Sequence, residues 1–275
     1  MLKQRFITAI ILAPLVLCGV FLLDPNNFAW FFAFITLLAA WEWANLSSID
    51  SPLYKVLYAV LITALLLLIK DVPIAWVLHA SVIWWFIASL FVLSFPDTSN
   101  YWRSKLVRCV MGIFVLLPMW KALVFIRSGN FVAVEGLDTL LLIVYMLLLV
   151  WVADTGAYFA GKTWGNAKLA PNVSPGKSWA GAWGGIVATM ILSLIASSLI
   201  DLDLVQACQL LLITVITAGV SIMGDLTESM FKRQRGIKDS SNLLPGHGGV
   251  LDRIDSLVAA IPVFVFCLSL LGWME

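Results

Sequence analysis

The chain has 275 residues, of which 61% are hydrophobic and only 12% are charged. Soluble domains carry about 25% charged residues, so this composition excludes a soluble enzyme, a disordered chain and a nucleic-acid-binding module. The net charge of +1 gives no overall preference for an acidic or a basic partner. The composition therefore predicts an integral membrane protein.

Long apolar segments follow one another along the chain. A helix that crosses a membrane needs about 20 mostly apolar residues, and about nine segments approach that length. They are residues 6–23, 28–46, 53–69, 74–93, 106–126, 140–160, 179–200, 204–223 and 256–273. Their apolar character is continuous rather than alternating, which favours helices over a β-barrel. We predict an all-α, polytopic integral membrane helical bundle.

The basic residues are distributed unevenly between the predicted links. If the N-terminus is cytoplasmic, all 17 Lys and Arg residues fall on the cytoplasmic side except Lys70, Lys121 and Arg127. Cytoplasmic loops of membrane proteins carry an excess of Lys and Arg. This asymmetry predicts a cytoplasmic N-terminus. Basic residues such as Arg103 and Lys105 are explained by this orientation and by attraction to anionic membrane lipids.

The polar motifs gather in the second half of the chain. Residues 1–130 are apolar and poor in polar motifs, so we assign them to helix packing, lipid access and, if a homodimer forms, its contacts. Residues 131–275 form the expected catalytic transmembrane domain. Its two predicted cytoplasmic loops, 161–178 and 224–255, hold most of the Gly, Pro, Lys and Asp chemistry.

Five carboxylates of this second half lie within or beside predicted spans, where burial is costly and usually serves a function. They are Asp154, Asp225, Glu228, Asp252 and Asp255. Asp225 and Glu228 are three residues apart and share one helical face. The predicted topology places all five near the cytoplasmic leaflet. Glu42 lies at the same level in the first half, where helix capping or an ion pair with nearby basic residues is the simpler interpretation.

Basic residues and glycines accompany these acids. Magnesium is typically held by one or two carboxylates together with phosphate oxygens and water, and cationic side chains stabilise phosphoryl charge. Lysines and arginines of both loops supply that charge. Backbone N–H groups at Gly248 and Gly249 can approach an anion, and His247 suits a phosphate contact or proton transfer. The run 173–179 looks like a phosphate loop, although it lacks the first glycine of a Walker A motif.

Residues 229–255 carry a more specific pattern. A Ser is followed by Lys-Arg, Lys-Asp, Pro-Gly-His-Gly-Gly and finally Asp-Arg-Ile-Asp. This run resembles the signature of the phosphatidate cytidylyltransferase family, also called CDP-diacylglycerol synthases. Residues 154–158, 161–162 and 174–179 also resemble the C-terminal half of that family. Ala180 departs from the pattern, because many members have an acidic residue or Gln there, so any role of that side chain is in doubt.

The resemblance implies that CTP and phosphatidate give CDP-diacylglycerol and diphosphate in phospholipid biosynthesis. The lipid phosphate is itself the nucleophile, and phosphoryl transfer depends mostly on positioning and charge stabilisation. We expect Asp225 and Asp252 to bind Mg²⁺, with Asp154, Glu228 and Asp255 as outer or alternative ligands and a second metal ion left open.

The other expected roles follow from the same resemblance. The expected catalytic residues are Asp225, Asp252, Lys232, Arg233, Lys238, His247 and Arg253, and the expected substrate-binding residues are Ser174, Lys177, Ser178, Ser229, Gly248 and Gly249. The basic residues would hold the triphosphate and the lipid phosphate, and His247 with its glycines would contact the leaving diphosphate. We expect a bacterial inner membrane location with the active site facing the cytoplasm.

Two other functions remain as alternatives. A CTP-dependent polyprenol or diacylglycerol kinase would share the metal and basic residues but would release CDP instead of diphosphate. A transporter would show two corresponding halves with broken helices and charges at mid-membrane. Here the charges gather at one leaflet, which disfavours a transporter.

Overall fold

The computed structural model describes residues 2–129 and 138–274, with side chains from residue 11 onward. In chain order the elements are α1 (Leu2–Leu22), α2 (Pro25–Leu46), α3 (Pro52–Ile69), α4 (Ile74–Leu93), the 3₁₀ helix η1 (Asp97–Trp102), α5 (Lys105–Ser128), α6 (Thr139–Trp164), the strands β1 (Lys168–Ala170) and β2 (Ser174–Ser178), α7 (Trp179–Leu199), α8 (Leu204–Arg235), α9 (Leu251–Ile254) and α10 (Leu257–Leu270).

Eight segments within the described ranges are helical, long and apolar enough to cross a membrane. The last of them runs through α9 and α10, and α1 contributes a shorter apolar stretch, Ile11–Leu22. These helices confirm the predicted all-α polytopic bundle. The count of nine spans and the cytoplasmic N-terminus stay predictions.

The short links between the helices also cap them. The carboxylate of Asp24 accepts hydrogen bonds from the backbone N–H groups of Asn26 and Asn27 at the start of α2. The bond from Asn27 is the main reason why the pKa of Asp24 is lowered. The C-terminus of α8 is capped by Gly236, which follows Arg235. Its φ of +77° is a conformation that glycine adopts at little cost.

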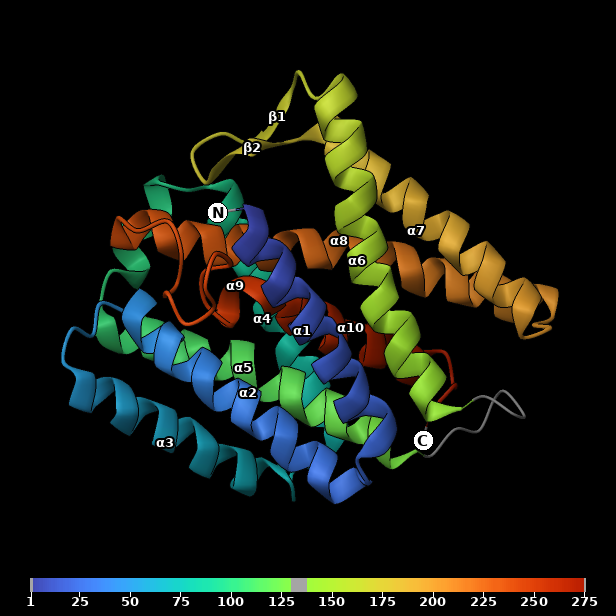
Figure 1. Ribbon diagram of the computed structural model, residues 1–275, viewed down its shortest axis with the longest axis horizontal. Helices are drawn as coiled ribbons and strands as arrows, with labels where there is room; N and C mark the ends of the chain where they lie inside the picture. The colour runs from blue at the N-terminus through green and yellow to red at the C-terminus, as the bar shows by residue number, and fades with distance from the viewer. Residues whose placement is uncertain (1, 130–137, 275) are drawn as a thin grey trace.

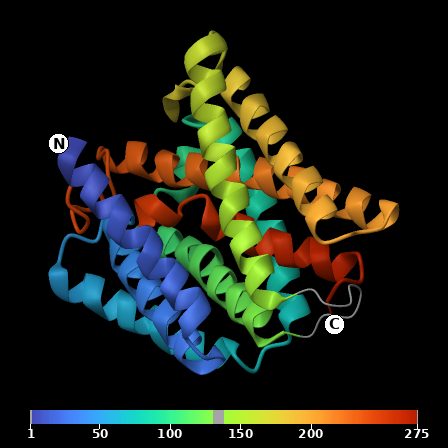
Figure 2. The same cartoon turned by 45° about the vertical axis from the view of Figure 1, so that its right-hand side comes forward.

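The helices form two groups that α8 and α10 join (Figure 1). Helices α2, α3 and α5 pack together in one group, and α6 and α7 form a second, of which α6 also contacts α5 (Figure 2). Helix α8 packs against α7 on one side and against α4 and α10 on the other. The joining helices therefore lie where the two groups meet.

The buried core crosses the expected domain division. Trp43, Trp120, Phe231 and Phe264 belong to one cluster of buried side chains, although they come from both halves of the sequence. The proposed boundary between 1–130 and 131–275 falls at residues 130–137, outside the described residues. The division into two domains stays a prediction.

Small residues bring α6 and α7 close together. A Cβ added to Gly185 of α7 would lie 2.7 Å from the carbonyl oxygen of Ala153, and one added to Gly156 of α6 would lie 2.8 Å from the carbonyl oxygen of Gly184. Such close backbone approach is typical of helix pairs in membranes. It fixes Asp154, which follows Ala153, beside α7 and the hairpin.

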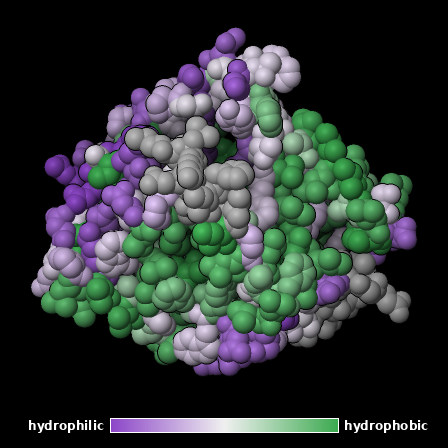
Figure 3. Space-filling model, viewed as in Figure 1, coloured by the Kyte–Doolittle hydropathy of each residue, from purple (hydrophilic) through white to green (hydrophobic). Residues whose placement is uncertain are grey.

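The surface separates into apolar and polar regions. Figure 3 shows hydrophobic residues across the centre and the right-hand side, and hydrophilic residues gathered at the upper left and along the lower edge. An apolar band between two polar ends is the surface that a bilayer requires. The hairpin and residues 236–250, hereafter the signature loop, belong to one polar end. There Arg233, near the end of α8, donates from Nε to the carbonyl of Val173 in the hairpin.

The expected loops are more ordered than the sequence indicated. Residues 168–178 of the expected loop 161–178 contain an antiparallel hairpin, in which Lys168 pairs with Ser178 and Ala170 with Ser174. The hydrogen bonds between the two strands satisfy backbone N–H and C=O groups that lie beyond the end of α6. The second expected loop, 224–255, begins inside α8, because the Glu, Met, Lys and Arg residues up to Arg235 favour helix. Only the signature loop separates α8 from α9.

Candidate active site

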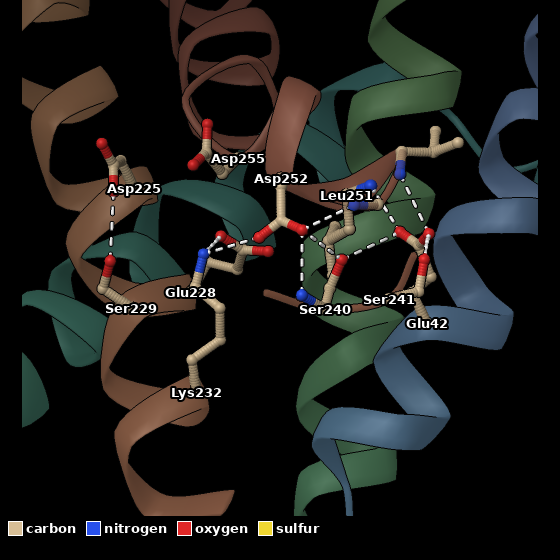
Figure 4. A network of polar contacts seen from close by, with 12 residues as sticks. Glu42, Asp225, Glu228, Ser229, Lys232, Ser240, Ser241, Leu251, Asp252 and Asp255 are labelled. Carbon is tan, nitrogen blue, oxygen red and sulfur yellow. Dashed lines mark hydrogen bonds and ion pairs between the residues drawn. The ribbon is translucent and has the colours of Figure 1, made fainter. Parts of the chain in front are cut away.

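Lys232 of α8 lies between two buried carboxylates (Figure 4). Its Nζ is 2.5 Å from Oε2 of Glu228 and 2.7 Å from Oδ1 of Asp252. The three side chains are only 10%, 3% and 4% exposed. Removing one partner from a buried ion pair is strongly destabilising, because a charge is left without compensation. Lys232 therefore ties α8 to α9.

Asp252 is satisfied almost entirely by the protein. Its Oδ2 accepts hydrogen bonds from the backbone N–H of Ser240 at 2.9 Å, from the Ser240 hydroxyl at 2.8 Å and from the N–H of Gly249 at 2.7 Å. With Lys232 on Oδ1, four donors occupy a carboxylate that has about four acceptor positions. Asp252 therefore anchors the signature loop, and its expected role as a metal ligand stays a prediction.

A second buried carboxylate comes from the first half of the chain. Glu42 of α2 is fully buried and accepts hydrogen bonds from the Ser241 hydroxyl at 2.6 Å and from the backbone N–H groups of Val250 at 2.9 Å and Leu251 at 2.6 Å. The structure confirms capping, but of α9 rather than of its own helix. Among the described residues Glu42 forms no ion pair.

A second group of charged side chains is partly exposed to solvent, unlike the buried carboxylates and lysine described above. Lys177 Nζ of β2 lies 2.6 Å from Oδ2 of Asp225, and the two side chains are 27% and 26% exposed. Ser229 donates from its hydroxyl to the other oxygen of Asp225 at 3.2 Å. The exposed Asp154 interacts electrostatically with Asp225, Lys177 and Arg253. The predicted convergence of distant acidic and basic residues is therefore present.

A pocket of about 380 Å³ adjoins this open group. Asp154, Lys162, Lys177 and Ser178 contribute its polar residues, and α6, α7 and α8 contribute apolar ones. Pockets that hold small ligands usually measure about 300–1,000 Å³. The size and the mixed lining suit a ligand that has a charged part and an apolar part.

Several other predicted residues share a second, polar cavity. Lys238, His247, Gly248 and Arg253 line a hollow of 640 Å³ between the signature loop and α9. Gly248 has a φ of +82°, and a Cβ there would press against the carboxylate of Asp252. The glycine therefore lets the loop turn directly over Asp252, which places the second cavity next to this carboxylate.

Some predicted substrate residues have structural partners. The Ser178 hydroxyl accepts a hydrogen bond from the N–H of Gly181 at 3.1 Å and caps α7. Ser174 pairs with Ala170 in the hairpin, and Gly249 donates to Asp252. These contacts explain why the residues lie at the site. Their contact with substrate stays a prediction.

The carboxylates fit a metal ion that is bound together with substrate phosphates. Within residues 2–129 and 138–274, no three His, Cys, Asp or Glu side chains are grouped as a ready-made metal site. Magnesium commonly needs only one or two carboxylates, with phosphates and water completing its shell. Asp225 offers a partly exposed carboxylate, and Asp154 and Asp255 interact electrostatically with it. Glu228 and Asp252 are engaged by Lys232 instead.

Sequence reasoning did not assign Glu42, Ser240 or Ser241 to the site. The contact between Glu42 and Ser240 joins residues 198 positions apart, so no local spacing reveals it. The only signal was a carboxylate near the end of an apolar span, which membrane energetics flags as costly.

The long apolar helices and the paired charges at one polar end are typical of a membrane protein that binds a charged ligand. The chain belongs to the cytidylyltransferase family, whose model matches residues 3–271. This confirms the resemblance seen in residues 229–255, and it makes the chain a nucleotidyltransferase.

Three bacterial relatives bear the name phosphatidate cytidylyltransferase. The protein from Pseudomonas aeruginosa is 46% identical, and the match covers 99% of both chains. That from Haemophilus influenzae is 37% identical over 97% of this chain and 98% of its own, and that from Staphylococcus haemolyticus is 34% identical over 95% and 97%. Family membership implies a metal-dependent nucleotidyl transfer.

Proposed function

We propose that this protein transfers the cytidylyl group of CTP to phosphatidate and so forms CDP-diacylglycerol and diphosphate in phospholipid biosynthesis. The observation that carries this proposal is the match over nearly the whole length to a phosphatidate cytidylyltransferase at 46% identity. The site agrees with it, because the residues of the signature run lie together with Lys177 and Asp154 at one polar end.

In this reaction a phosphate oxygen of phosphatidate attacks the α-phosphorus of CTP. A bond forms between that oxygen and the α-phosphorus, the bond from the α-phosphorus to the bridging oxygen breaks, and diphosphate leaves. The lipid phosphate is already anionic, so the protein needs no Ser or Cys nucleophile. Its task is to orient two phosphates and to stabilise their charge.

The basic residues divide this task between the two cavities. Lys177 lies at the first pocket, where it can exchange its contact with Asp225 for a phosphate oxygen. Lys238 and Arg253 line the second cavity, where they would hold the diphosphate portion beside His247. We assign Arg233 a supporting role, because its Nε holds the hairpin at Val173.

We propose Mg²⁺ as the metal, held by Asp225 with Asp154 or Asp255. When bound, it would neutralise phosphate charge that the acidic side chains would otherwise repel. Glu228 and Asp252 act through Lys232, which they hold in place. A second metal ion stays a prediction.

The surroundings of the first pocket support a lipid substrate. A neighbouring apolar hollow of 290 Å³ is lined by side chains such as Phe95, Trp183 and Met223, and it shares Leu169 and Ile186 with the pocket. Acyl chains can therefore lie along apolar surface while the phosphates meet the polar residues. A soluble nucleotide would reach the same residues from the aqueous side.

We place the protein in a bacterial inner membrane with this site facing the cytoplasm. The bacterial relatives and the uneven distribution of Lys and Arg support this location. A single cysteine introduced at the exposed Leu243 tests it, in a variant whose own cysteines are replaced. An impermeant thiol reagent should label it in inverted membrane vesicles and not in intact cells. A homodimer stays a prediction that light scattering of the detergent complex can measure.

The direct test uses the purified full-length protein in detergent with phosphatidate, MgCl₂ and CTP labelled at the α-phosphate. We expect the label to enter the lipid, diphosphate to be released, and a chelator to stop both. Release of CDP with an unlabelled phosphorylated lipid would instead identify a lipid kinase. Asp225→Asn serves as the inactive control.

A further inference from the structure

We propose that Glu42 is a positioning residue for the nucleotide. Its buried carboxylate fixes the signature loop and Asp252, and through them the cavity lined by Lys238, His247 and Arg253. This inference rests on the proposed function, because it names the substrate whose binding Glu42 controls.

Glu42 joins two separate parts of the signature loop. Its Oε1 accepts from the hydroxyl of Ser241, in the first half of the loop, and from the backbone N–H of Val250, at its end. Its Oε2 accepts from the N–H of Leu251, the first residue of α9. One carboxylate on α2 therefore sets the separation of residues that lie nine or more positions apart in the chain.

Ser240 connects Glu42 to Asp252. Its hydroxyl oxygen lies 2.8 Å from Oδ2 of Asp252 and 3.2 Å from Oε2 of Glu42, between the two carboxylates in Figure 4. A hydroxyl has one proton to donate, so its orientation depends on both neighbours at once. Asn45, almost one turn further along α2, donates from Nδ2 to the Ser240 carbonyl at 2.9 Å. Helix α2 thus holds this serine at two atoms.

The loop backbone lies directly against the carboxylate. A Cβ added to Gly249 would collide with the Glu42 carboxylate and the Ser240 hydroxyl. The backbone of Gly249 is therefore in close contact with both groups. Gly249 is followed by the two N–H groups that Glu42 binds and is preceded by Gly248, which lines the second cavity. A shift of Glu42 therefore moves the cavity wall.

Simple stabilisation does not account for this residue. A buried carboxylate is costly even when it is hydrogen-bonded, and Glu42 has no cationic partner among the described side chains. A packed apolar residue would avoid that cost but would leave the N–H groups of Val250 and Leu251 without acceptors. The function that remains is to specify the geometry of the loop.

The test compares Glu42→Gln with the wild-type full-length protein in detergent. The glutamine has the same shape, but in either orientation its NH₂ group would face a backbone N–H, of Val250 or of Leu251, donor against donor. We expect hydrogen exchange at the backbone of residues 250–251 to become at least about tenfold faster, as the loss of such a hydrogen bond implies. We also expect the KM for CTP to rise at least about fivefold, while the KM for phosphatidate stays within about twofold.

Thr36→Val is the matched control, because Thr36 is also buried in α2 and its hydroxyl donates to the Phe32 carbonyl of its own helix. It should leave the exchange rate at residues 250–251 and the KM for CTP at wild-type values. Ser241→Ala removes one donor to Glu42, and it should raise the exchange rate and the KM for CTP by smaller factors than Glu42→Gln does. If Glu42→Gln fails to fold, Ser241→Ala decides the question by the same criteria.

Unchanged exchange at 250–251, or an unchanged KM for CTP, would overturn the inference. An equal rise of exchange throughout α2 and α5 would also overturn it, because it would indicate a general loss of packing, which alters the amount of active enzyme and not its KM. If the wild-type protein forms no CDP-diacylglycerol, the proposed function fails, whereas the exchange measurement still reports whether Glu42 holds the loop.

Discussion

Two groups of charges lie close together in this molecule and differ in how they are satisfied. In the buried group, Lys232 faces Glu228 and Asp252, and the carboxylate of Asp252 also accepts hydrogen bonds from Ser240 and Gly249. In the open group, Lys177 and Asp225 are each about a quarter exposed, and Lys177 lines a pocket. Both contain acid–base pairs at similar distances, so distance alone does not separate them.

The difference teaches which charges can act on a substrate. A buried pair has already lost its hydration and depends on its partner, so exchanging that partner for a ligand is costly. A partly exposed pair loses less when water or a phosphate replaces one contact. We therefore assign the buried group to holding the site and the open group to binding and chemistry. The predictions below test that division.

The largest effect is expected from Lys232→Met. The substitution leaves Glu228 and Asp252 without their cation in a buried position, and it should lower the free energy of unfolding by about 3–5 kcal/mol. Denaturation of the detergent-solubilised protein, followed by circular dichroism, measures this loss. A variant as stable as the wild type would remove the distinction between the two groups.

Asp225→Asn should separate activity from stability. We expect kcat/KM at limiting magnesium to fall about 100-fold, because the partly exposed carboxylate beside Lys177 loses its charge, while the unfolding midpoint stays close to the wild type. Asp97→Asn, an exposed acid of η1, is the control and should keep full activity. Normal activity of Asp225→Asn at limiting magnesium would contradict its assignment as a metal ligand.

Lys177→Ala should have a moderate effect that is specific to substrate binding. The loss of one charge-assisted contact to phosphate is expected to raise the KM for CTP about tenfold. The fold should persist, because the ion pair with Asp225 is partly exposed and contributes little to stability. Steady-state kinetics with each substrate varied in turn shows the change. An unchanged KM for CTP would remove Lys177 from the nucleotide site.

The smallest effect is expected from Asp50→Asn, which breaks the ion pair with Arg235 at the end of α8. The Asp50 side chain is 71% exposed, and such pairs contribute about 0–1 kcal/mol. Stability and kinetics should match the wild type in the same assays. A loss of activity here would mean that the open group extends beyond the pocket.

Much of the architecture could be predicted from local sequence. The predicted spans 28–46 and 74–93 match α2 and α4 closely, because a run of about 20 apolar residues has few alternatives in a bilayer. The signature run likewise identified the region that contains Lys232, Asp252 and Arg253. The hairpin was missed, since residues 168–178 carry no alternating pattern.

The sequence by itself determined the class of protein, most of its spans and the residue types at the site. Only the tertiary structure decided which carboxylates are enclosed and which are open, and it alone joined Glu42 to a loop 198 positions away. The reason is physical. Membrane insertion responds to hydrophobicity summed along a single segment, whereas the state of a charge depends on the few donors and cations that folding brings within about 3 Å of it.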